Sequence, residues 1–74
     1  AVEVYPNPAN AEMNIICEGM KRITIISISG KVMLDTEVAN DKKTIDMSRF
    51  AQGSYVLRIS TSDNIITRIV TVTK

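Results

Sequence analysis

The sequence predicts a small all-β domain, a seven-stranded antiparallel β-sandwich of immunoglobulin-like kind. Three observations favour this class. First, 25 of the 74 residues are valine, isoleucine or threonine, whose branched side chains suit a pleated strand better than a helix. Second, polar and apolar residues alternate with a period of two, and no stretch sustains a helical period. Third, turn-forming residues recur at short intervals, so neighbouring strands must pair mostly antiparallel.

The turns divide the chain into seven strands. Glycine, proline, asparagine or aspartate occurs in each turn, at 6–10, 18–20, 29–31, 39–42, 52–53 and 62–64. The strands predicted between them are Val2–Tyr5, Glu12–Cys17, Arg22–Ile28, Lys31–Val38, Lys43–Asp46, Ser54–Ser60 and Ile65–Thr73. Short strands at this spacing are typical of a two-sheet sandwich, and one domain occupies residues 1–74.

The same alternation predicts the core. Every second side chain of a strand points to one face, so we expect a core that contains Ile23, Ile25, Tyr55, Leu57 and Ile59. Segment 46–51 is less regular, and we expect it to cross between the sheets with Met47 and Phe50 as apolar plugs. Gly30 and Gly53 are assigned to turn geometry.

The single cysteine is predicted to be structural. Cys17 shares a strand face with Met13 and Ile15, which indicates a buried and inert thiol. An intermolecular or reactive role is the alternative. One cysteine without any histidine allows neither a disulfide nor a zinc site within one chain.

The composition argues against an enzyme and against a nucleic-acid-binding protein. The formal net charge is +1, and the basic residues are dispersed, whereas nucleic acid requires a concentrated basic patch. The chain has no histidine for a catalytic triad, its eight carboxylates are scattered, and its three glycines form no phosphate-binding loop. Asn40-Asp41 and Asp63-Asn64 are the only calcium candidates, and we interpret both as hairpin tips in αL geometry. We therefore expect no catalytic residue, metal, cofactor or small-molecule substrate.

An unusual element follows the first strand. Two prolines flank Asn7, and proline fixes φ, lacks an amide donor and holds the preceding residue extended. Pro6-Asn7-Pro8 is therefore predicted to be a stiff bend that ends the strand and discourages pairing at its edge.

The order of short motifs resembles one family. These motifs are Tyr5-Pro6-Asn7-Pro8-Ala9-Asn10, Met13-Asn14-Ile15, a strand ending in Ser29-Gly30-Lys31, Ile45-Asp46-Met47, the block from Phe50 to Ile59, Thr67-Arg68-Ile69-Val70 and a closing Lys74. Together they resemble the type A C-terminal sorting domain of the type IX (Por) secretion system of Bacteroidetes. The resemblance covers essentially the whole chain.

This resemblance implies an export signal that catalyses nothing. It implies a longer secreted protein whose cargo crosses the inner membrane, folds in the periplasm and is then taken to the cell surface or the medium. The implied partners are the outer-membrane translocon, a sortase-like protease that removes the domain, and the preceding cargo domain. We expect cleavage in exposed sequence before or near Ala1, because a protease needs an extended segment.

The last strand is the main recognition hypothesis. If Ile65–Thr73 lies at a sheet edge, its unpaired backbone groups allow a partner to extend the sheet by β-augmentation. The recognition candidates are Pro6, Asn7, Pro8, Gly53, Tyr55, Arg68, Ile69, Val70, Val72 and Lys74.

Two other functions fit the same composition. An immunoglobulin-like spacer or adhesion module of a cell-surface protein shares the fold and the lack of catalytic residues. An accessory β-domain of a hydrolase is a third interpretation, but it requires an exposed aromatic or charged cleft, and the chain has only three aromatic residues.

Overall fold

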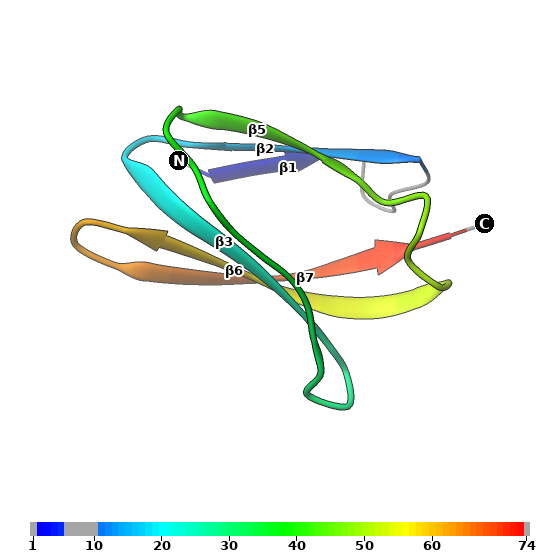
Figure 1. Cartoon of the computed structure of the whole chain (residues 1–74). Helices are drawn as coiled ribbons and strands as arrows, with labels where there is room; N and C mark the ends of the chain where they lie inside the picture. The colour runs from blue at the N-terminus through cyan, green and yellow to red at the C-terminus, as the bar shows by residue number, and fades with distance from the viewer. Residues whose placement is uncertain (1, 6–10, 74) are drawn as a thin grey trace.

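Two β-sheets face each other across an apolar core (Figure 1). The computed structural model describes residues 2–5 and 11–73, and in these residues it has seven strands and no helix. Nothing in this part of the chain has the length and hydropathy of a membrane-spanning helix. The strands are β1 (Val2–Tyr5), β2 (Glu12–Cys17), β3 (Met20–Ser27), β4 (Val32–Glu37), β5 (Lys42–Asp46), β6 (Gly53–Thr61) and β7 (Ile65–Val72).

All pairings are antiparallel. One sheet has the order β1-β2-β5 and the other has the order β4-β3-β6-β7. The chain changes sheet after β2, after β4 and after β5, so β2 and β5 pair although the whole β3–β4 hairpin lies between them in sequence. The predicted fold class, a seven-stranded antiparallel immunoglobulin-like sandwich, is confirmed.

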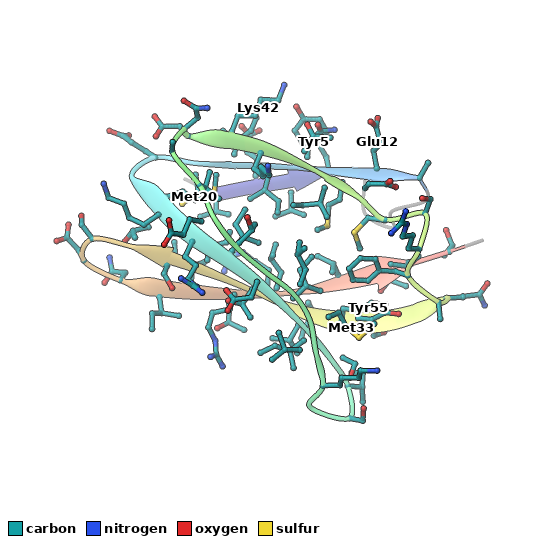
Figure 2. The ribbon with its side chains drawn as sticks, in the orientation of Figure 1. Tyr5, Glu12, Met20, Met33, Lys42 and Tyr55 are labelled. Carbon is teal, nitrogen blue, oxygen red and sulfur yellow. The ribbon has the colours of Figure 1, made fainter. Side chains whose placement is uncertain are left out.

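The core follows the strand alternation. The five predicted core residues, Ile23, Ile25, Tyr55, Leu57 and Ile59, are all buried. Segment 47–52 crosses between the sheets as expected, and its Met47 and Phe50 are buried as well. Cys17 is buried beside Met13 and Ile15, as the alternation predicts. On the opposite side of the β1-β2-β5 sheet, Tyr5, Glu12 and Lys42 point away from the core (Figure 2).

Tyr55 anchors the crossover segment to β6. Its hydroxyl donates a hydrogen bond of 2.6 Å to the Ala51 carbonyl, four residues upstream. Its ring meets Phe50 edge-on, with 5.3 Å between centroids and 78° between planes. A tyrosine at the start of the sixth strand that bonds back to the preceding corner is a hallmark of immunoglobulin-like sandwiches, where it is called the tyrosine corner. The arrangement fixes the direction in which the chain enters the second sheet.

Several strand limits differ from the sequence prediction. β3 begins at Met20, two residues early, because Glu18 and Gly19 alone make the turn. Gly19 adopts φ +75° there, and its amide donates to the Asp41 Oδ1 at 3.2 Å. β4 is one residue shorter at each end, β5 begins one residue early, β6 extends one residue further at each end, and β7 ends at Val72.

The interpretation of both Asn/Asp tips is corrected by the structure. Asn40-Asp41 is not a hairpin tip, because β4 and β5 lie in different sheets. Asp63-Asn64 is a hairpin tip, but no described residue other than glycine has positive φ. The Thr61 hydroxyl holds that turn instead, by accepting from the amides of Asp63 and Asn64 and donating to the Asn64 carbonyl. Gly30, with φ +94°, does supply turn geometry between β3 and β4.

Candidate recognition surface

The two sheets end in four edge strands, β1, β5, β4 and β7. An exposed edge carries unpaired backbone groups that can pair with another chain, and proteins usually obstruct such edges. β1 has only four residues. β5 carries Lys42 and Lys43, and Lys43 lies on the core-facing side opposite Ile15. Charged side chains at these positions are a typical obstruction of an edge.

The β4 edge is obstructed by an irregularity. Leu34 pairs with Ile25 and Val32 pairs with Ile26, so Met33 has no partner and forms a bulge.

β7 differs from the other three edges. It has eight residues and pairs with β6 in continuous register from Ile65 to Val72. β7 is therefore the longest regular edge of the described chain, and the hypothesis that the last strand lies at a sheet edge agrees with the topology.

The core-facing side of β7 carries three apolar residues and one arginine. Val70 and Val72 are buried in the core, and Ile66 packs against it. Arg68 has the same orientation, since it lies opposite the buried Leu57, but its side chain is exposed at the rim. The guanidinium donates 3.1 Å to the carbonyl of the adjacent Thr67, and within residues 2–5 and 11–73 no carboxylate pairs with it.

An apolar row crosses the outer face of the four-stranded sheet. Val32 pairs with Ile26, Ile26 pairs with Val56, and Val56 pairs with Ile69, so one apolar side chain from each of the four strands lies in line. The two inner members are half-buried, whereas Val32 is 56% and Ile69 is 59% exposed. We call these four residues the apolar row. Contiguous exposed apolar side chains on a solvent-facing sheet are typical of an interaction surface.

The charged groups beside the apolar row are arranged as a local network. Arg22 Nε donates 2.6 Å and Nη2 donates 2.9 Å to the two carboxylate oxygens of Asp35, and Glu37 lies 3.9 Å away. The hydrogen bond from Arg22 holds the pKa of Asp35 below its ordinary value, and the Asp35 carboxylate raises the pKa of Arg22. Arg58, on the same face, has no such partner among the described residues.

The described residues among the recognition candidates predicted from the sequence do not lie on one face. Arg68 and Ile69 are exposed on opposite faces of β7. Val70 and Val72 offer only their backbone to a partner, because their side chains are buried. Tyr55 is 5% exposed, and Gly53 begins β6 with φ +149°. Pro6, Asn7, Pro8 and Lys74 lie outside the described residues. All of these assignments stay predictions.

Sequence reasoning missed the apolar row and the obstruction by Lys43. The signal for the row was present, because Val56 breaks the polar pattern of Ser54, Arg58 and Ser60 on the outer side of β6. The row depends on the register of four strands, however, and register is set by the fold as a whole.

The described surface has two hollows. One hollow of about 370 Å³ lies between residues 17–19 and residues 61–64, and another of about 500 Å³ lies beside Arg22 and Glu37. Across the described residues, no three histidine, cysteine, aspartate or glutamate side chains gather as a metal site requires. Among the described residues, the β7 edge and the apolar row beside it form the candidate recognition surface.

A family assignment follows from the sequence as a whole. The family model of the secretion system C-terminal sorting domain matches residues 3–73. The chain belongs to this family. The resemblance to type IX sorting domains drawn from the short motifs is confirmed, and the family is a non-catalytic export tag. A sorting domain of this kind implies export to the cell surface or the extracellular space.

The fold of the sorting domain recurs in a solved structure. This structure is of PorZ, an essential bacterial surface component of the type IX secretion system of Porphyromonas gingivalis. The similarity has a TM-score of 0.82 at 19% sequence identity and covers 100% of this chain, which spans only 12% of the PorZ chain. At this identity the likeness concerns the fold alone. Among curated proteins no match was found.

Proposed function

We propose that this sorting domain is read by the outer-membrane translocon of the type IX system through the β7 edge. The observation that carries the proposal is the contrast between edges: β1 is short, β4 is bulged, and β5 has two lysines in five residues, whereas β7 is long and regular and carries a single charge, Arg68. A signal that serves unrelated cargo must be recognised through the domain itself, and backbone pairing at an edge provides such recognition. The cargo precedes the domain and passes through the periplasm on its way out.

A sortase-like protease then removes the domain in this scheme. Cleavage requires an extended and accessible segment. All seven strands are held by pairing with a neighbour, so a cut within any of them would disrupt the sandwich. The cut therefore falls before β1 and leaves the sandwich intact.

The first test is export of a reporter. The 74-residue chain is fused behind a reporter that carries a signal peptide, and the fusion is expressed in a type IX-competent Bacteroidetes host. Reporter at the surface and in the medium is compared between this host and a translocon-deficient one. Translocon-dependent export supports the proposal. Periplasmic retention of a folded reporter contradicts it and favours an immunoglobulin-like spacer.

The second test determines whether recognition occurs at the β7 edge. Deletion of residues 70–74 removes the buried Val70 and Val72 together with the edge, so point variants are sharper. Lysine on an edge strand discourages pairing. Ile69→Lys introduces a lysine on β7. Val32→Lys introduces a lysine on β4, at the other end of the apolar row, where the replaced side chain has nearly the same exposed fraction as Ile69. Recognition through β7 predicts a loss of export for Ile69→Lys alone. Equal losses for both variants would locate recognition on the outer face of the sheet instead of the β7 edge.

A further inference from the structure

The single charge of β7 indicates which strand can pair with it. β7 reads Ile-Ile-Thr-Arg-Ile-Val-Thr-Val, and Arg68 is its only charged residue. Arg68 lies on the core-facing side of the edge, where a charge normally discourages added strands. The position corresponds to that of Lys43 on β5, which lies opposite Ile15 on the core-facing side of the other sheet. An added strand must therefore accommodate the guanidinium of Arg68.

A carboxylate on the incoming strand would satisfy this requirement. Arg68 donates only to the neighbouring Thr67 carbonyl in the described structure, so most of its donors remain available. Opposite charges on adjacent strands attract, and like charges directly opposite repel. A strand without an acidic residue leaves Arg68 unpaired at the new interface, whereas a strand with aspartate or glutamate at that position pairs with it.

Ile69, the residue next to Arg68, places a different requirement on the partner strand. Ile69 points to the opposite face and is the terminal member of the apolar row. A strand added to β7 places its own side chain beside Ile69, as a fifth member of that row. Because side chains alternate along a strand, the residue beside Ile69 and the residue beside Arg68 are neighbours in the partner sequence.

We infer that the partner of β7 is a β-strand that carries an acidic residue next to an apolar one, the acid facing Arg68 and the apolar side chain facing Ile69. This inference rests on the proposed recognition through β7. It argues against a second copy of this chain paired through β7, because the described β7 contains no carboxylate that could pair with Arg68.

The inference is tested by charge reversal in the reporter assay. Arg68→Glu is compared with Arg68→Lys and with Arg58→Glu, which makes the same charge change on the outer face of the adjacent strand β6. Thermal unfolding of each purified domain checks that the fold persists. We expect Arg68→Glu to lower export about tenfold, while Arg68→Lys and Arg58→Glu stay near the unchanged chain. Equal export by Arg68→Glu and the unchanged chain would overturn the inference, although translocon-dependent export by the unchanged chain would still support the proposed function.

A crosslink identifies the partner strand directly. A benzophenone-bearing residue in place of Ile69 is activated by light in exporting cells, and the joined peptide is sequenced by mass spectrometry. The expected peptide has aspartate or glutamate next to the crosslinked residue, and changing that acid to lysine restores export of Arg68→Glu. A peptide with no acid beside the crosslink, or no restoration by the reversed charge, contradicts the inference.

Discussion

Removal of one hydroxyl group separates the structural role of Tyr55 from a role in recognition. Tyr55→Phe deletes the 2.6 Å hydrogen bond to the Ala51 carbonyl and keeps the edge-on contact with Phe50. Because Ala51 is exposed, water can replace the hydroxyl at that carbonyl, so the cost is that of one net hydrogen bond, about 1 kcal/mol. For a domain of this size, that loss lowers Tm by about 4–8 °C.

The assay is thermal unfolding of the isolated domain followed by circular dichroism. Tyr5→Phe is the matched control, because Tyr5 is 43% exposed on the outer face of β1 and we expect its Tm to stay unchanged. If Tyr55 acts only in the tyrosine corner, export of a Tyr55→Phe reporter follows the fraction of folded domain. An unchanged Tm would refute the corner argument, and an unchanged Tm with strongly reduced export would assign the hydroxyl to a partner.

Four further changes test other parts of the structure. Ile25→Ala opens a cavity in the core at a cost of about 2–5 kcal/mol, enough to leave much of so small a domain unfolded in equilibrium denaturation. Gly53→Ala costs about 1–3 kcal/mol in the same measurement; its φ of +149° is unfavourable for alanine, although no atom lies within 4 Å of the new methyl group. Lys43→Val leaves the β5 edge less obstructed, so light scattering should detect concentration-dependent association without a large loss of stability. Asp35→Asn tests the pH dependence of stability. The pKa of Asp35 is lowered in the folded state, so its ion pair with Arg22 stabilises the folded domain above the unfolded pKa of about 3.9. This stabilisation is lost as pH falls through the folded pKa. The variant should therefore show a flatter loss of stability in acid titrations of unfolding.

The core could be predicted because it depends on local alternation. Tyr55, Leu57 and Ile59 occupy every second position of one strand, and burial of one face is sufficient to orient them all. Met47 and Phe50 could be predicted for a related reason, since apolar residues in an irregular segment have to be buried where the chain crosses between the sheets.

The connections were harder to predict than the faces. Asn40-Asp41 and Asp63-Asn64 have similar composition, yet one joins two sheets and the other closes a hairpin. The difference comes from distant contacts: the Asp41 carbonyl accepts from the Cys17 amide at 2.8 Å, and its side chain accepts from Gly19. Partners more than twenty positions away in sequence leave no local signal.

The recognition surface was predictable only in part. The sequence indicated Arg68 and Ile69 as candidates, and the structure places them on opposite faces of one edge strand. The other three members of the apolar row went unnoticed because their alignment requires the register of three pairings, including the bulge at Met33. The face on which a residue of one strand lies can be predicted from the sequence, whereas a row of residues from four strands depends on the register between those strands.

The burial of Cys17 gives the chain an internal reporter of its folding state. It is the only thiol in the sequence, and it lies 3% exposed at the end of β2. An alkylating reagent reaches a thiol in this position only when that end of the sandwich opens, so the modification rate measures the opening equilibrium. In a cell, domain that stays folded throughout export keeps Cys17 unmodified, whereas domain that unfolds in transit acquires the label. The mass of the exported or released domain then records which of the two occurred, with no engineered probe.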